Sequence, residues 1–264
     1  MKRFLITNPG LFLLVSIQLA FASTPPIIGI RINEGQKYTN SRSVFVEIRP
    51  LTTQADVVDQ IQFGEDPTLQ SASWQNYSSG KIPLTLSSED GLKEIYVRLK
   101  DKAGNVSPIE SAKIFLDTTP PEVQDFTINQ GNPYTNDPQR RVILNMKSTE
   151  PVQMQVSNDP SFTGLDWENF STSKKWILDP PGDGQKTVYI RLRDRAENIS
   201  STAKSSIILD TQPPTNTSLT INNGENFTTN PSVKLLIKAD DASMVRVVST
   251  NNAKILEYKP NSPQ

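Results

Sequence analysis

The sequence predicts an all-β protein made of tandem antiparallel β-sandwiches, the last of them incomplete. The first observation is an internal repeat, in which YVRLKDKAGNVS (residues 96–107) returns as YIRLRDRAENIS (residues 189–200), 93 positions later. The same offset relates the Leu-Asp-Thr segments at 116–118 and 209–211. One offset that covers so many positions without a gap indicates an internal duplication.

The second observation is a hydrophobic period of two. In the first copy Ile95, Val97 and Leu99 alternate with polar or amphipathic residues, and the second copy repeats the pattern at Val188, Ile190 and Leu192. Such alternation predicts strands that bury one face and expose the other. Asn-Glu-Gly at 33–35, Glu-Asp-Gly at 89–91 and Ala-Gly-Asn at 103–105 supply turns between them. About seven short strands per repeat are typical of an immunoglobulin-like sandwich.

The N-terminus has the order of a secretory signal peptide. Lys2 and Arg3 precede an apolar run over residues 11–19, and Ala20-Phe21-Ala22 follows it. This order predicts cleavage after Ala22 and export to the extracellular space, the cell surface or the periplasm. The apolar run is shorter than the roughly 20 residues of a membrane-spanning helix, so we expect no membrane span in the mature chain.

A third copy begins near Pro213, since Asn-Asn-Gly at 222–224 matches Asn-Gln-Gly at 129–131. It lacks counterparts of Trp167, of residues 189–194 and of residues 207–210, so half of its apolar face has no partner. We therefore expect a loosely ordered tail first, and second a bare strand edge that pairs with another chain into a dimer; a tail that folds back on the second unit is the third outcome. The expected segments are a signal peptide (1–22), two repeats (23–118 and 119–211) and a partial repeat (212–264).

Composition excludes several classes of function. Cysteine and histidine are both absent, which removes disulfides, Ser-His-Asp triads and His-ligated zinc. Without Lys2 and Arg3 the mature chain has 25 basic and 28 acidic residues, a balance that does not favour nucleic acid as a partner. Adjacent carboxylates such as Glu89-Asp90 and Asp240-Asp241 are expected to be solvated and to diverge. We predict no catalytic residues and no enzyme.

The motif Y-[VI]-R-L-[KR]-D-x-A-[GE]-N-[VI]-S, followed by L-D-T-x-P-P, resembles the bacterial immunoglobulin-like repeats of surface proteins and large adhesins. The resemblance covers residues 24–212 and the first half of a further unit. It implies a role as a spacer or adhesive stalk outside the cell. One position departs from the pattern, because Glu197 stands where Gly104 stands in the first copy. If that position needs a positive φ, we expect the second turn to be looser or differently shaped.

Oxygen ligands near the repeat ends make calcium the one cofactor to consider. The candidates are Asp101, Asn105 and Asp117 in the first copy, with Asp194, Asn198 and Asp210 in the second. Calcium takes about six to eight oxygen ligands, more than these sets offer. Hairpin caps formed by side-chain hydrogen bonds to the backbone explain Asp101 and Asn105 better, so we expect no bound cofactor.

Aromatic residues permit two interpretations. Trp74, Trp167 and Trp176, with Tyr77 and Phe170, could form a sugar-stacking platform. Trp74 and Trp167 recur at equivalent positions after an Asp-Pro turn, which favours packing within the core of each unit.

Two functions follow from the sequence. One is an exported structural or adhesive surface protein that contacts an extracellular protein or a glycan surface. The other is an accessory carbohydrate-binding module of a secreted hydrolase system. Aromatic rings exposed in a row on one sheet face would favour the second.

Overall fold

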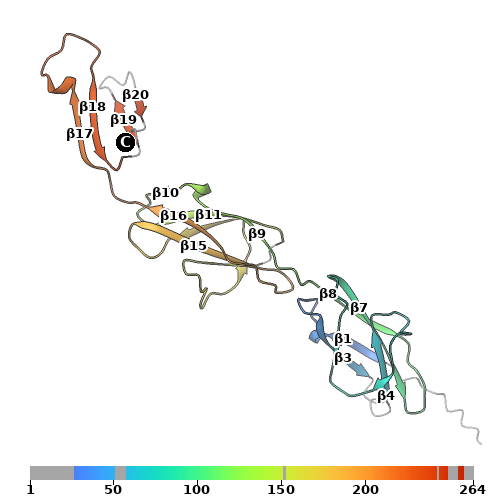
Figure 1. Ribbon diagram of the computed structural model, residues 1–264. Coiled ribbons are helices and arrows are strands. Elements are labelled where there is room, and N and C mark those ends of the chain that lie inside the picture. The colour runs from blue at the N-terminus through green and yellow to red at the C-terminus, as the bar shows by residue number, and fades with distance from the viewer. Residues whose placement is uncertain (1–26, 51–57, 151–152, 243, 249–254, 259–264) are drawn as a thin grey trace, which may run out of the picture. The chain divides into compact units, whose positions relative to one another are not determined.

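The computed structural model describes residues 27–50, 58–150, 153–242, 244–248 and 255–258. The predicted signal peptide lies outside them. Apart from three single 3₁₀ turns, the regular structure of the described residues is β-strand (Figure 1). None of the described helices has the length and apolar character needed to cross a membrane.

The described residues of the first repeat form eight strands in two sheets. A three-stranded sheet has the order β1-β3-β6, and a five-stranded sheet has the order β2-β8-β7-β4-β5. The strands are β1 (Ile27–Ile32), β2 (Tyr38–Thr39), β3 (Ser43–Pro50), β4 (Val58–Gly64), β5 (Gln75–Asn76), β6 (Lys81–Thr85), β7 (Gly91–Asp101) and β8 (Glu110–Leu116). All pairings are antiparallel except that of β2 with β8.

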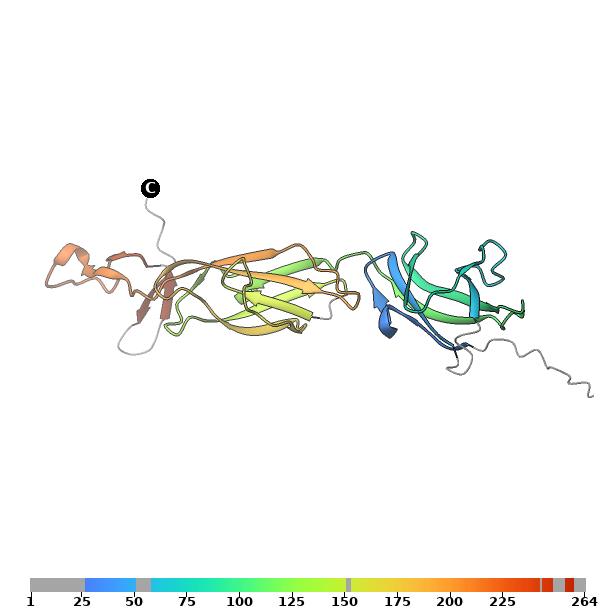
Figure 2. The same ribbon diagram turned by 90° about the horizontal axis from the view of Figure 1, so that it is seen from below.

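The second repeat, coloured from green to orange in Figure 2, has the same order of strands in both sheets, β9-β11-β14 and β10-β16-β15-β12-β13. Its strands are β9 (Val123–Ile128), β10 (Tyr134–Thr135), β11 (Arg141–Ser148), β12 (Gln153–Ser157), β13 (Glu168–Asn169), β14 (Ser173–Ile177), β15 (Gly184–Arg193) and β16 (Ala203–Leu209). The predicted duplication is therefore a duplication of fold. Both repeats are antiparallel β-sandwiches of the immunoglobulin-like type, as the sequence predicted.

Each sandwich has its own apolar core between its two sheets. Ile95, Val97 and Leu99 on β7 are fully buried and pack with Val44 and Val46 of the facing sheet. In the second repeat Val188, Ile190 and Leu192 on β15 pack with Val142 and Leu144 in the same way. The period of two in the sequence thus identified the buried faces correctly, because successive side chains of a strand point to opposite sides.

The third segment forms two separate antiparallel pairs, β17 (Thr215–Ile221) with β18 (Leu235–Asp240), and β19 (Val245–Val248) with β20 (Ile255–Tyr258). We refer to residues 215–258 as the half-unit. Strands were expected around Leu235 and Val245, and both are present. Ile221 lies opposite Leu235 as Ile128 lies opposite Leu144, so Leu235 is the counterpart of Leu144. The strand β18 therefore follows β11 by 91 positions, and the expected offset of 93 positions was wrong for this strand.

No residue of the half-unit for which burial is described is buried, in contrast to the two sandwiches. Ile221 is 47% exposed, whereas its counterparts Ile32 and Ile128 are 2% and 1% exposed. Ile237 is 36% exposed, whereas Met146 at the equivalent position is 4% exposed. The apolar face of the half-unit is thus uncovered, as the sequence predicted.

Candidate functional surfaces of the two repeats

Asp101 and Asn105 form a tight hairpin between β7 and β8. The Asp101 carboxylate accepts hydrogen bonds from the backbone N–H groups of Ala103 (2.9 Å) and Asn105 (2.8 Å) and from the Asn105 amide (2.8 Å). These hydrogen bonds, the amide of Asn105 foremost, hold the pKa of Asp101 below its ordinary value. This geometry is the capping arrangement expected from the sequence.

The second hairpin repeats the first. The Asp194 carboxylate accepts hydrogen bonds from the Asn198 backbone N–H (2.9 Å) and from its side-chain amide (2.8 Å). Glu197 adopts φ 71°, where Gly104 adopts φ 91°. The position does adopt a positive φ in both repeats. The second turn keeps the Asp–Asn hydrogen bonds, while its backbone hydrogen bond from the Asp194 N–H to the Asn198 carbonyl is 3.2 Å long, compared with 3.0 Å for Asp101 and Asn105.

The calcium candidates of the first repeat lie at opposite ends of its five-stranded sheet. β7 and β8 run antiparallel with Gly91 opposite Leu116, so Asp117 lies beside the start of β7 and Asp101 lies at its end. Ten extended residues separate the two ends by about 33 Å. Asp210 follows β16 in the same way, since Gly184 lies opposite Leu209. Asp101 and Asp117 therefore cannot bind one ion within a repeat, and no group of three or more acidic residues suited to a metal occurs among the described residues.

A second carboxylate, that of Asp90, binds the segment that follows β8. It accepts hydrogen bonds from the Thr118 N–H (3.0 Å), the Thr118 hydroxyl (2.9 Å) and the Thr119 hydroxyl (3.1 Å). Asp183 holds Thr211 in the same manner, with the N–H at 3.1 Å and the hydroxyl at 2.8 Å. In both cases the hydrogen bonds lower the pKa of the carboxyl. Asp90 is exposed, as expected, and its carboxylate also accepts these hydrogen bonds.

Trp74 lies on the outer face of the five-stranded sheet rather than in the core. Cations from β7 cover its ring, with the Lys100 ammonium 4.4 Å and the Arg98 guanidinium 5.3 Å from the ring centre. The Arg98 guanidinium also donates to the side chain of Gln62, which is 4% exposed. Cation–π contact of this kind stabilises both groups.

Trp167 has the same environment in the second repeat, with Arg193 at 4.6 Å and Arg191 at 5.5 Å. The expected core position of Trp74 and Trp167 is therefore wrong, since neither belongs to the apolar core clusters. Tyr77 packs against the first core, and Phe170 and Trp176 pack against the second. Trp176 lies on the other sheet, so the five aromatic residues do not form one platform.

An open groove of about 840 Å³ lies along β11 and β14 of the second repeat. Its lining residues are Asn129, Arg141, Val142, Ile143, Asn158, Lys174, Lys175, Trp176 and Ile177. The strand register places Arg141 opposite Ile177 and Ile143 opposite Lys175, so apolar and cationic side chains alternate on the exposed face. Ile143 is 39% exposed and Ile177 is 56% exposed.

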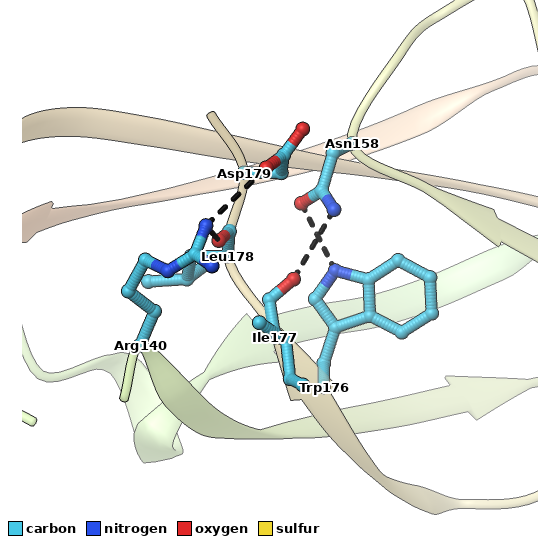
Figure 3. Close-up of polar contacts among 6 residues, drawn as sticks. All are labelled: Arg140, Asn158, Trp176, Ile177, Leu178 and Asp179. Carbon is cyan, nitrogen blue, oxygen red and sulfur yellow. Dashed lines mark hydrogen bonds and ion pairs between the residues drawn. The ribbon is translucent and has the colours of Figure 1, made fainter. Parts of the chain in front are cut away.

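Asn158 holds the indole at the edge of this groove (Figure 3). Its side-chain oxygen accepts a hydrogen bond from Trp176 Nε1 (3.0 Å), and its amide nitrogen donates to the Ile177 carbonyl (3.2 Å). Arg140 donates to the Leu178 carbonyl at 2.9 Å, as Arg42 does to Leu86 in the first repeat. Because the two repeats share this arginine contact, we assign Arg140 to the scaffold.

The groove carries a net positive charge. Arg141 is paired with Asp137 at 2.9 Å, and Lys174 is paired with Glu168 at 2.5 Å. Lys175 forms no ion pair with any described residue. The groove can therefore bind an apolar surface that carries negative charge. Sequence reasoning missed it, because Ile143, Asn158 and Ile177 come from three separate segments and no motif connects them.

No protein-family model matches the chain, and no curated protein matches it either. Three solved structures are similar in fold. The fibronectin(III)-like modules of Clostridium thermocellum CbhA share 9% identity, cover 69% of this chain and 94% of that one, and give a TM-score of 0.42. The D00-D0 domain of intimin shares 14% identity over 69% of this chain and all of that one, with a TM-score of 0.28.

The FN1-FN3 domains of chicken CNTN1 share 14% identity over 91% of this chain and 87% of that one, with a TM-score of 0.29. At such identities and TM-scores the likeness concerns the fold and says nothing of function.

Proposed function

We propose that this chain is an exported, non-enzymatic surface protein whose two complete repeats act as spacer or binding modules. The observation that carries the proposal is the combination of two sandwiches, each with its own core, with one open groove on the second. A sandwich that is stable by itself can position a binding face away from the surface that bears it. The order of residues 1–22 supports export.

The groove beside Trp176 is the contact surface of this proposal. Exposed isoleucines supply apolar area, and Lys175 supplies a charge that is not already paired within the described residues. Its partner is an extracellular protein or a glycan surface with negative charge.

Binding of the mature chain to immobilised extracellular proteins and glycans tests this proposal. Ile177→Asp should reduce binding at least tenfold, because it replaces an exposed apolar side chain of the groove with a carboxylate that repels a negatively charged partner. Phe45→Asp is the matched control, since Phe45 is 48% exposed on the equivalent sheet of the first repeat and should leave binding unchanged. Equal binding by both variants would exclude the groove. Secreted protein that still begins at Met1, rather than at Ser23, would exclude the processing part of the proposal.

One observation favours the alternative, an accessory carbohydrate-binding module. Trp176 lines the groove, and Trp74 and Trp167 do not; its ring packs against the core of the second repeat, and the Lys174 ammonium lies 5.7 Å from the ring centre. A chain with Trp74→Phe and Trp167→Phe keeps Trp176 as its only tryptophan. Quenching of its fluorescence by soluble glycans would support the alternative, and an unchanged spectrum would oppose it.

A further inference from the structure

We infer that the free edge of β14 binds an extended peptide segment of a protein partner as an added strand, with an acidic residue of that segment beside Lys175. The inference rests on the proposed function, because β14 lines the groove that serves there as the contact surface. It narrows the partner to one class, an extended and acidic segment of protein.

The strand β14 is the edge of its sheet. In both complete repeats the three-stranded sheet ends at the corresponding strand, β6 in the first and β14 in the second, and no described strand pairs with the outer side of either. This edge therefore belongs to the fold of a complete repeat. An unpaired edge is a template for another strand, and extended peptides bind sheet edges in this way.

The hydrogen bond beyond the end of β14 shows which of its backbone groups face outward. The Leu178 N–H donates to the Arg140 carbonyl at 2.9 Å, so these two residues are a hydrogen-bonded pair. Hydrogen-bonded and non-hydrogen-bonded pairs alternate along an antiparallel ladder. Ile177 and Lys175, one and three positions before Leu178, are consequently at non-hydrogen-bonded positions. Their N–H and C=O groups point away from β11, toward the free edge.

Side chains occupy the two ends of this edge and leave its centre open. The Asn158 amide donates to the Ile177 carbonyl at 3.2 Å (Figure 3). The Ser171 hydroxyl donates to the Ser173 carbonyl at 2.7 Å. No hydrogen bond within the described part of the chain uses the N–H or the C=O of Lys175. These two groups, with the Ile177 N–H, are the ones that an added strand would bind.

The first repeat has a proline at the same position. Pro83 of β6 lies opposite Phe45 of β3. Ile143, which lies opposite Lys175, is the counterpart of Phe45, because the N–H of each donates to the first asparagine of the preceding 3₁₀ turn, at 2.8 and 2.9 Å respectively. Proline has no N–H and occurs at sheet edges with that side outward, where it hinders the addition of a strand. The edge of β14 lacks this protection.

The exposed face of β14 determines which side chains suit the added strand. Lys175 and Ile177 are both exposed and project from the same face, two positions apart. Lys175 forms no ion pair with any described residue, whereas Lys174 is paired with Glu168. Opposite charges and apolar pairs directly across two strands stabilise the pairing. A fitting segment therefore has an acidic residue beside Lys175 and an aliphatic residue two positions away, beside Ile177.

Selection of short random peptides displayed on phage tests the inference on the mature chain. The selected peptides should have an aspartate or glutamate two positions from an aliphatic residue. No selected peptide, or selected peptides without this spacing, would overturn the inference.

Two substitutions at one position separate the charge of Lys175 from its backbone donor. Lys175→Ala removes the ammonium and keeps the N–H, whereas Lys175→Pro removes both. Because Pro83 occupies the equivalent position, the fold accommodates proline there, and thermal unfolding of the variant checks this. A selected peptide should bind Lys175→Pro at least tenfold more weakly than Lys175→Ala.

The same variants distinguish this inference from the proposed function. Equal binding by Lys175→Pro and Lys175→Ala, with binding still lost in Ile177→Asp, would overturn the added strand and leave the groove as a contact surface. That result is expected of a glycan held by side chains alone. Binding that all three substitutions leave unchanged would exclude the groove itself, and the inference with it.

Amide hydrogen exchange of the unsubstituted chain, measured by NMR, is independent of any effect of a substitution on folding. The Lys175 N–H should exchange at least ten times more slowly when the selected peptide is bound. The Trp176 N–H faces β11 and should be protected with and without peptide. An exchange rate at Lys175 that does not change on peptide binding would overturn the inference.

Discussion

Gly104→Ala tests whether the hairpin after β7 depends on a left-handed backbone. Gly104 adopts φ 91°, and a Cβ placed there meets no atom within 4 Å. A steric clash therefore contributes nothing, and the cost is that of holding an L-residue at positive φ, about 1–2 kcal/mol. At RT of about 0.6 kcal/mol, this corresponds to a roughly 5- to 30-fold change in the equilibrium between closed and open forms of the repeat.

Hydrogen exchange measured by mass spectrometry on the whole chain reports the opening equilibrium of each repeat separately. Peptides from β7 and β8 should lose protection by that factor, while peptides from β15 and β16 keep theirs. Glu197→Gly should act in the opposite sense, since Glu197 holds φ 71° with a side chain that disfavours it, and should raise the stability of the second repeat by about 1 kcal/mol.

Gly29→Ala is the control for Gly104→Ala. Gly29 lies in β1 with no positive φ and equally open space at its Cβ position, so alanine should be neutral or slightly stabilising there. If Gly104→Ala were as harmless as Gly29→Ala, left-handed strain at this turn would be refuted.

Three further predictions concern the whole chain. Deletion of residues 215–264 should leave the thermal unfolding of both complete repeats nearly unchanged, because no half-unit residue with described burial is buried; a large loss of stability by calorimetry would contradict this. Millimolar calcium should leave the melting temperature unchanged, whereas a bound ion would add roughly 2.7 kcal/mol at a hundredfold excess over its Kd. A calcium-dependent rise that disappears in Asp117→Ala would show that an ion does bind. The free energy of unfolding should fall on acidification, because hydrogen bonds hold the pKa values of Asp90, Asp101 and Asp183 below the unfolded value of about 3.9. This stability is fully present above that value and is lost as the pH falls through the folded pKa values, so Asp90→Asn should flatten the dependence measured by urea unfolding between about pH 5 and pH 2.

Features encoded over short distances could be predicted from the sequence. The alternation in β7 and β15 identified the buried faces, since a strand's side chains alternate whatever it packs against. The Asp101–Asn105 hairpin was predictable for the same reason, because the donor and acceptor are four residues apart and need no other segment. The uncovered face of the half-unit followed from the repeat, since the missing strands could be read by comparison with a complete copy.

Features that depend on which distant segments meet were decided by the tertiary structure. The alternation of apolar residues does not predict that Trp74 and Trp167 lie on the outer face of the sheet beneath cations. Their position depends on the path of the loop that brings each ring against a neighbouring strand. Asp90 and Thr118 are 28 residues apart and meet because β7 and β8 are antiparallel. The same pairing separates Asp101 from Asp117 by the length of a strand, which no spacing in the sequence could reveal. Local patterns define the strands and turns, and only the pairing of strands determines which side chains share a surface.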